Sequence, residues 1–70
     1  MGANEVIFLV EEAEEGGYNA HALNAAIFTQ GDDLDDLREQ VRDAVACHFE
    51  DDERPAVIRL HFVREETLAS

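Results

Sequence analysis

The stretch that decides the fold is GDDLDDLREQVRDAVACHF, residues 31–49. Its least polar residues recur every three or four positions, which places them along one face of a helix. This stripe consists of Leu34, Leu37, Val41, Ala44, Val45, His48 and Phe49. Asp33, or Asp32 before it, can accept hydrogen bonds from the free N–H groups of the first turn. The stretch therefore predicts an amphipathic helix over about residues 33–49.

Three strands are expected before this helix and one after it. Residues 6–10 (VIFLV) are β-branched, aromatic or aliphatic, and residues 14–17 (EEGG) have the composition of a hairpin turn. The expected strands cover about residues 5–11, 18–23, 26–29 and 56–64. This order predicts one small β-β-β-α-β domain over residues 1–70, of the α+β class, with a mostly antiparallel sheet and the helix packed on one face.

The first strand is apolar on both of its faces, yet one helix can cover only one face of a sheet. A chain of 70 residues with a single cysteine also has a small core and no disulfide to reinforce it. We therefore expect a homodimer or a higher oligomer. The candidate interface residues are Phe8, Val10, His21 and His61. The alternative is that the tail, residues 65–70, folds over the exposed face, with Leu68 as a possible anchor.

The charge is strongly acidic, with 17 acidic residues against 5 basic ones and a net charge of −12. Such a surface repels nucleic-acid phosphates and anionic lipids, so we expect neither direct nucleic-acid binding nor membrane binding. It attracts a small basic protein instead and speeds the encounter with it. The candidate partner-binding residues, on the polar face of the helix, are Asp35, Asp36, Glu39 and Asp43. A second interpretation is that the charge serves solubility alone.

The chain lacks the features of a secreted protein. No basic region precedes the short apolar run at residues 6–10, so no signal peptide is expected. The lone thiol of Cys47 fits a reducing compartment. We therefore expect the protein to be cytoplasmic.

No group of residues has the spacing of a catalytic, metal or cofactor site. Cys47 and His48 are neighbours, but neighbours on a helix point about 100° apart and form a poor nucleophile–base pair. Cys47 and His48 share the predicted helix, whereas His21 and His61 lie on two different predicted strands. None of these four residues has the sequence spacing of zinc ligands. The acidic runs at 11–15 and 50–53 lack the alternating pattern of a calcium loop. We predict no catalytic residue, no metal and no cofactor.

The order and spacing of these pieces resemble HicB-like antitoxins. The resemblance rests on the acidic turn Glu15-Gly16-Gly17-Tyr18 and on residues 28–37, FTQGDDLDDL, and covers about residues 5–50. It implies a β-β-β-α-β domain that oligomerises and occludes a small basic HicA-type toxin, a ribonuclease. In the family, acidic groups of the antitoxin would meet basic groups of the toxin.

Two features depart from the family pattern. Many members continue into a DNA-binding region, whereas this sequence ends at Ser70, so we do not expect it to regulate transcription directly. Many also carry a Pro and a Gly-Cys pair where this chain has LNAA at residues 23–26. The alternative function is therefore a stand-alone homo-oligomeric domain with a regulatory or structural role. A 2-oxo acid dehydrogenase activity, a label that similar short chains sometimes carry, is not expected, because 70 residues cannot build a thiamine diphosphate site.

Overall fold

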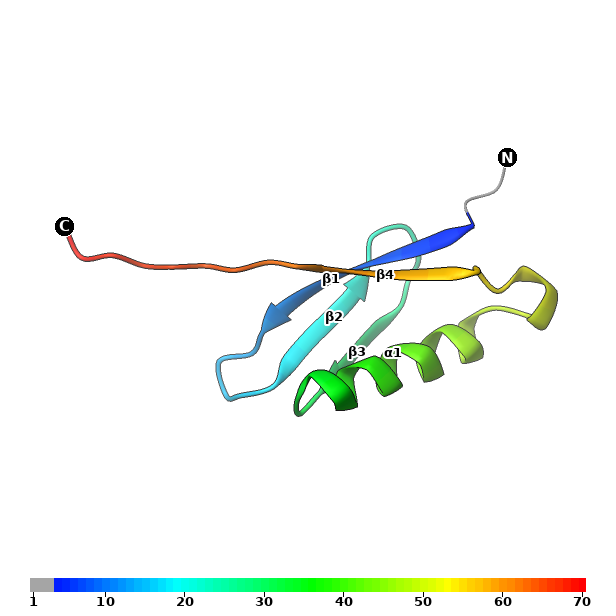
Figure 1. Cartoon of the computed structure of the whole chain (residues 1–70), viewed down its shortest axis with the longest axis horizontal. Coiled ribbons are helices and arrows are strands. Elements are labelled where there is room, and N and C mark those ends of the chain that lie inside the picture. The colour runs from blue at the N-terminus through cyan, green and yellow to red at the C-terminus, as the bar shows by residue number, and fades with distance from the viewer. Residues whose placement is uncertain (1–3) are drawn as a thin grey trace.

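The computed structural model describes residues 4–70 and has the predicted order of elements (Figure 1). The elements are β1 (Glu5–Glu12), β2 (Tyr18–Ala22), β3 (Phe28–Gly31), α1 (Leu34–His48), a short 3-10 turn η1 (Asp51–Glu53) and β4 (Val57–Phe62). One helix lies between the third and fourth strands. The expected α+β class and β-β-β-α-β order are confirmed.

The four strands form one sheet in the order β3-β2-β1-β4. β2 pairs antiparallel with both β1 and β3. The β1–β2 turn closes where the Ala13 N–H donates to the Gly17 carbonyl at 2.9 Å. Gly16 and Gly17 both have positive φ in this turn, as the two glycines led us to expect. β4 runs parallel to β1, because α1 carries the chain back across the sheet before β4 begins.

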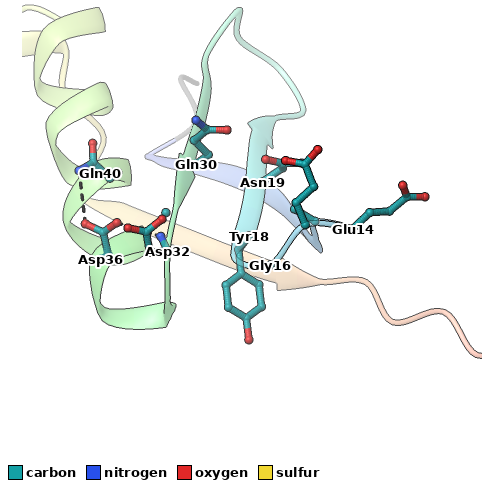
Figure 2. Close-up of a pocket in the computed structure, with 11 residues that line it drawn as sticks. Glu14, Gly16, Tyr18, Asn19, Gln30, Asp32, Asp36 and Gln40 are labelled. Carbon is teal, nitrogen blue, oxygen red and sulfur yellow. Dashed lines mark hydrogen bonds between the residues drawn. The ribbon is translucent and has the colours of Figure 1, made fainter.

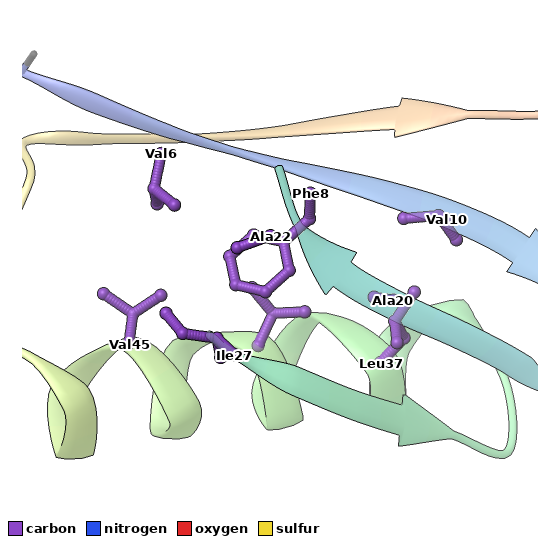
Figure 3. Close-up of a cluster of buried hydrophobic side chains, with 9 residues drawn as sticks. Val6, Phe8, Val10, Ala20, Ala22, Ile27, Leu37 and Val45 are labelled. Carbon is purple, nitrogen blue, oxygen red and sulfur yellow. The ribbon is translucent and has the colours of Figure 1, made fainter. Parts of the chain in front are cut away.

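α1 covers one face of the sheet and encloses a single apolar core (Figure 3). The core residues, each less than one-tenth exposed, are Val6, Phe8, Val10, Ala20, Ala22, Ile27, Leu37, Val41 and Val45. On the strands they alternate with residues of the other face, as the period of two requires. β2 contributes only alanines to this set, which leaves room for the larger side chains of β1 and α1.

Gly31 allows α1 to approach the end of β3 closely. A Cβ atom on Gly31 would lie 2.5 Å from the backbone nitrogen of Leu37 and 2.6 Å from its Cα. Real Cβ atoms do not approach backbone atoms so closely, so any side chain here would displace the helix. Glycine at this position is therefore a packing requirement of the strand-to-helix connection.

The N-terminus of α1 is capped by its own aspartates. Asp33 is the N-cap, and its Oδ1 accepts from the Asp36 N–H at 2.7 Å. The Asp36 carboxylate in turn accepts from the backbone N–H of Asp32 at 2.9 Å. This reciprocal arrangement is close to a capping box and satisfies two N–H groups at the helix start. Of the two candidate caps, the structure selects Asp33.

Asp33→Ala is expected to lower the free energy of unfolding by about 1 kcal/mol, because the Asp36 N–H loses its acceptor. Urea denaturation followed by circular dichroism measures the change. Asp33→Asn is the control, since asparagine caps a helix about as well as aspartate and should restore most of the loss. An Asn variant as unstable as the Ala variant would contradict a hydrogen-bonding role for this side chain.

The structure corrects two sequence-based expectations. The third strand was expected at about 26–29 but spans Phe28–Gly31. Ile27 instead ends the preceding loop, where its carbonyl accepts from the Ala22 N–H and its side chain enters the core. The prediction that Leu68 anchors the tail is also wrong, because its side chain is 80% exposed. The tail from residue 63 onward is exposed throughout and extends away from the sheet (Figure 1), so it covers neither face.

Candidate functional site

The outer side of α1 carries a row of acidic side chains. Asp35, Glu39 and Asp43 are spaced four residues apart, which places them one turn above another along the helix. All three are exposed, and they lie on the side of the helix opposite the buried Leu37 and Val41. We call these three residues the acidic row. Only Asp35 has a close cation among the described residues, Arg38, whose Nη1 lies 2.8 Å from its Oδ1.

Asp36, the fourth predicted contact residue, has a different role. Its side chain is half-buried, and its carboxylate accepts from the Asp32 N–H and, at 3.4 Å, from the Gln40 side chain (Figure 2). Its own N–H donates to Asp33. The structure thus places Asp36 in the helix cap and outside the acidic row, because its position in the first turn suits it to bond back to the residues before the helix.

A polar hollow of about 800 Å³ lies beside the start of α1 (Figure 2). It is bounded by the β1–β2 turn, by the end of β3 and by the first turns of the helix. Its lining includes the carboxylates Glu14, Glu15, Asp32 and Asp36 and the amides Asn19, Gln30 and Gln40. Sequence reasoning identified the acidic turn but missed the amides, because they come from three elements whose proximity depends on the strand register. The lining offers hydrogen-bond acceptors and negative charge, and it contains neither a cysteine nor a histidine.

The sheet face away from α1 is uncovered and partly apolar. One cross-strand row on this face runs from β3 to β4 through Phe28, His21, Leu9 and His61. Beside this row, the Leu23 N–H donates to the carbonyl of Ile7 at 2.9 Å. Phe28 is 69% exposed and Leu23 is 55% exposed. This is the second apolar face that the sequence of β1 predicted.

Two of the four predicted interface residues do not lie on this face. Phe8 is 0% exposed and Val10 is 1% exposed, both beneath α1. The prediction of Phe8 and Val10 as interface residues is therefore wrong, and Ile7 and Leu9 occupy the uncovered face of β1 instead. The physical reason is the register: Leu9 lies opposite His21, so Phe8 must face the other side. His21 and His61 do lie on the uncovered face, on either side of Leu9.

The cysteine and the three histidines do not converge on one site. Cys47 and His48 are both exposed at the end of α1. The His48 ring is not packed in the core but forms a T-shaped pair with the Phe49 ring, with centroids 4.9 Å apart. Within residues 4–70, no three His, Cys, Asp or Glu side chains are grouped so that they could hold a metal ion. The same residues include no helix with the length and apolar character needed to cross a membrane.

Comparisons with known proteins place the chain in a family. It is 60% identical over 50 residues to a UPF0150 protein of Archaeoglobus fulgidus, an alignment that covers 71% of this chain and 74% of the relative. It is 42% identical over 65 residues to a UPF0150 protein of Thermotoga maritima, covering 93% of this chain and 91% of that protein. No family model matches the chain. No solved structure matches it either. At these identities and coverages, the chain belongs to the UPF0150 protein family.

Proposed function

We propose that this protein is a non-catalytic binding module whose acidic row docks a small basic protein. The observation that carries the proposal is the acidic row itself: three exposed carboxylates on successive turns of α1, on a chain of net charge −12. The helix holds these charges at fixed spacing, so its backbone loses little conformational freedom when a basic partner binds. Long-range attraction between opposite net charges also raises the association rate.

We further propose that the module acts in the cytoplasm as a HicB-like antitoxin and that its partner is a small basic ribonuclease toxin. The support is the resemblance in residues 15–18 and 28–37, together with the physical roles of these residues. Gly16 and Gly17 form the β1–β2 turn, and Gly31 permits the close approach of α1. The resemblance thus extends to residues that this β-β-β-α-β fold requires.

A second candidate function is a stand-alone homo-oligomeric domain without a toxin partner. The uncovered sheet face supports it, because Phe28 and Leu23 are both more than half exposed there. Apolar side chains grouped on one face commonly mark a protein–protein contact. The two candidates make different demands on the surface: the first uses the acidic row, and the second uses the sheet.

Charge reversal on α1 tests the first candidate. Replacing Asp35, Glu39 and Asp43 together by lysine is expected to lower the affinity for a copurifying basic protein by roughly 30-fold, because three attractive contacts become repulsive. Titration calorimetry on the purified complex measures the change. Added salt should narrow the difference in affinity between the wild type and the triple variant, since salt screens exposed charges.

The control is a triple variant of equal charge change that leaves α1 intact. Glu11→Lys, Glu12→Lys and Glu65→Lys alter three exposed carboxylates outside the helix. This variant should retain most of the affinity. An equal loss in both triple variants would mean that net charge alone drives binding, and the acidic row would then not be the contact surface.

A further inference from the structure

The outer edge of β4 presents unpaired backbone groups. The Val57 N–H donates to the Asn4 carbonyl at 3.1 Å, and the Val63 N–H donates to the Val10 carbonyl at 2.8 Å. Odd-numbered residues of β4 therefore direct their backbone N–H and C=O groups toward β1. Since the direction alternates along a strand, Ile58, Leu60 and Phe62 direct theirs outward, away from the sheet. β4 is also the last strand on its side of the sheet, so this edge is open.

The side chains along this edge are apolar and incompletely covered. Ile58, Leu60 and Phe62 lie opposite Val6, Phe8 and Val10 of β1, and so they share the face on which α1 packs. The helix packs chiefly over β3 and β2, away from β4. A hollow of about 220 Å³ remains between α1 and β4, and Phe62 is 50% exposed. An open strand edge with apolar side chains readily pairs with another chain.

The same edge gathers the positive charge of the molecule. All 5 basic residues are arginines, and each lies in β4, beside it in sequence or next to it in space. Arg59 is in β4, Arg54 and Arg64 flank the strand, and Arg38 and Arg42 line the hollow with Ile58 and Leu60. Three of these arginines, Arg38, Arg54 and Arg59, pair with carboxylates of their own chain and offset some of the net charge of −12, so this edge repels a second copy less than a purely acidic surface would.

We propose that a second copy of the chain pairs with this edge, β4 antiparallel to β4, about a two-fold axis at Leu60. The two four-stranded sheets then form one continuous sheet. Leu60 exchanges both backbone hydrogen bonds with Leu60 of the second copy, and Ile58 does so with Phe62. The contact is isologous, which means that the same surface of each chain meets its counterpart on the other.

Side-chain complementarity selects this register. With the axis at Leu60, Ile58 lies opposite Phe62 on the helix side, and Val57 lies opposite Val63 on the other side. In the tail, Glu66 lies opposite Arg54, which brings opposite charges together. An axis at Phe62 would instead place Leu60 opposite Arg64, and an axis at Ile58 would place Phe62 opposite Arg54. Of these three axes, only the one at Leu60 places an apolar residue opposite each of Ile58, Leu60 and Phe62.

The pairing rests on the homo-oligomeric candidate function and makes it more specific: it takes the β4 edge as the contact in place of the uncovered sheet face, and it gives the symmetry and the register. It uses no residue of the acidic row and is tested on the purified chain alone. A failed toxin partnership and a failed dimer are therefore separate outcomes.

The mass of the protein in solution is the first test. Light scattering after size exclusion should give twice the chain mass of 7.8 kDa for the wild type. Phe62→Glu should shift the protein to monomer, because a carboxylate would then lie opposite the apolar Ile58 of the second copy. Phe28→Glu tells the two candidate contact surfaces apart, because Phe28 is 69% exposed on the uncovered face of the opposite edge strand: this variant should remain dimeric if β4 is the contact and become monomeric if the uncovered face is. A monomeric wild type, or equal effects of the two variants, would overturn the proposal.

Disulfide trapping tests the register without disturbing the core. In a Cys47→Ser background, Val57→Cys and Val63→Cys each replace a partly exposed side chain on the face away from α1. These positions form a non-hydrogen-bonded pair across the proposed interface, with Cα atoms about 4.5 Å apart, which is within disulfide range. A mixture of the two variants should form a covalent dimer under mild oxidation.

Each variant alone should crosslink far less, because its two thiols would be roughly 20 Å apart along the paired strands. Crosslinking of either variant alone as efficiently as the mixture, or no crosslinking in the mixture, would overturn the Leu60-centred register. Circular dichroism of each variant verifies that the domain is folded.

Discussion

Phe8→Ala is expected to lower the free energy of unfolding by about 3–5 kcal/mol, the largest loss from any single side chain considered. Phe8 is 0% exposed and lies in the middle of β1, opposite Ala22 of β2 and Leu60 of β4. The alanines of β2 cannot fill the space that the ring leaves, so a cavity remains. A domain of this size is stabilised by only about 3–10 kcal/mol, so the variant should be largely unfolded at moderate temperature.

Leu9→Ala is the control for this prediction. Leu9 is the next residue of β1 but lies on the uncovered face, where truncation removes few contacts, and its loss should be about 1 kcal/mol. Thermal and urea unfolding at one fixed protein concentration measure both variants, because self-association would also stabilise the fold. Equal losses at Phe8 and Leu9 would contradict the placement of the core on the helix side of β1.

Gly31→Ala is expected to cost about 3 kcal/mol, at the upper end of the usual range for an overpacked site. The new Cβ would meet the backbone of Leu37 at 2.5 Å, and helix backbone cannot rotate aside as a side chain can. The helix must therefore move off the end of β3, which weakens the packing of Leu37 in the core. Urea unfolding measures the loss of stability. Hydrogen exchange of the α1 backbone amides should also become faster in this variant.

Gly16→Ala separates this steric effect from the general cost of losing a glycine. Gly16 has a φ of 103°, but a Cβ there would meet no atom within 4 Å. Its replacement should therefore cost only about 1–2 kcal/mol, from the strained backbone. A Gly31 variant no less stable than the Gly16 variant would contradict the close approach of β3 and α1.

The features that could be predicted from the sequence depend on local periodicity and turn chemistry. The apolar stripe from Leu34 to Val45 predicts the ends of α1 to within a residue or two, because a spacing of three and four residues matches the period of an α-helix. Asp33 was named as a cap because aspartate before an apolar stripe has that chemistry. The Gly16-Gly17 turn followed from the ability of glycine to adopt positive φ.

The features that could not be predicted depend on register between strands. Alternation within β1 shows that Phe8 and Leu9 face opposite sides, but it does not show which side α1 covers. The pairing of Leu9 with His21 shows that these two residues share a face, and the burial of Phe8 shows that α1 covers the other face. The predicted third strand ends too early for a related reason. Gly31 precedes the aspartates that mark the helix start, but in the structure it pairs with Tyr18 as the last residue of β3. The hollow beside α1 escaped prediction because its lining comes from separate elements.

The most direct test of the central claim, that the chain acts by binding a basic protein through α1, is affinity purification of the tagged protein from its own cell. Quantitative mass spectrometry should compare the wild type with the variant that carries lysine at Asp35, Glu39 and Asp43. We predict that the wild type retains a stoichiometric small basic protein and that the triple variant loses it. Recovery of the wild type alone, or retention of the same partner by both proteins, would contradict the claim.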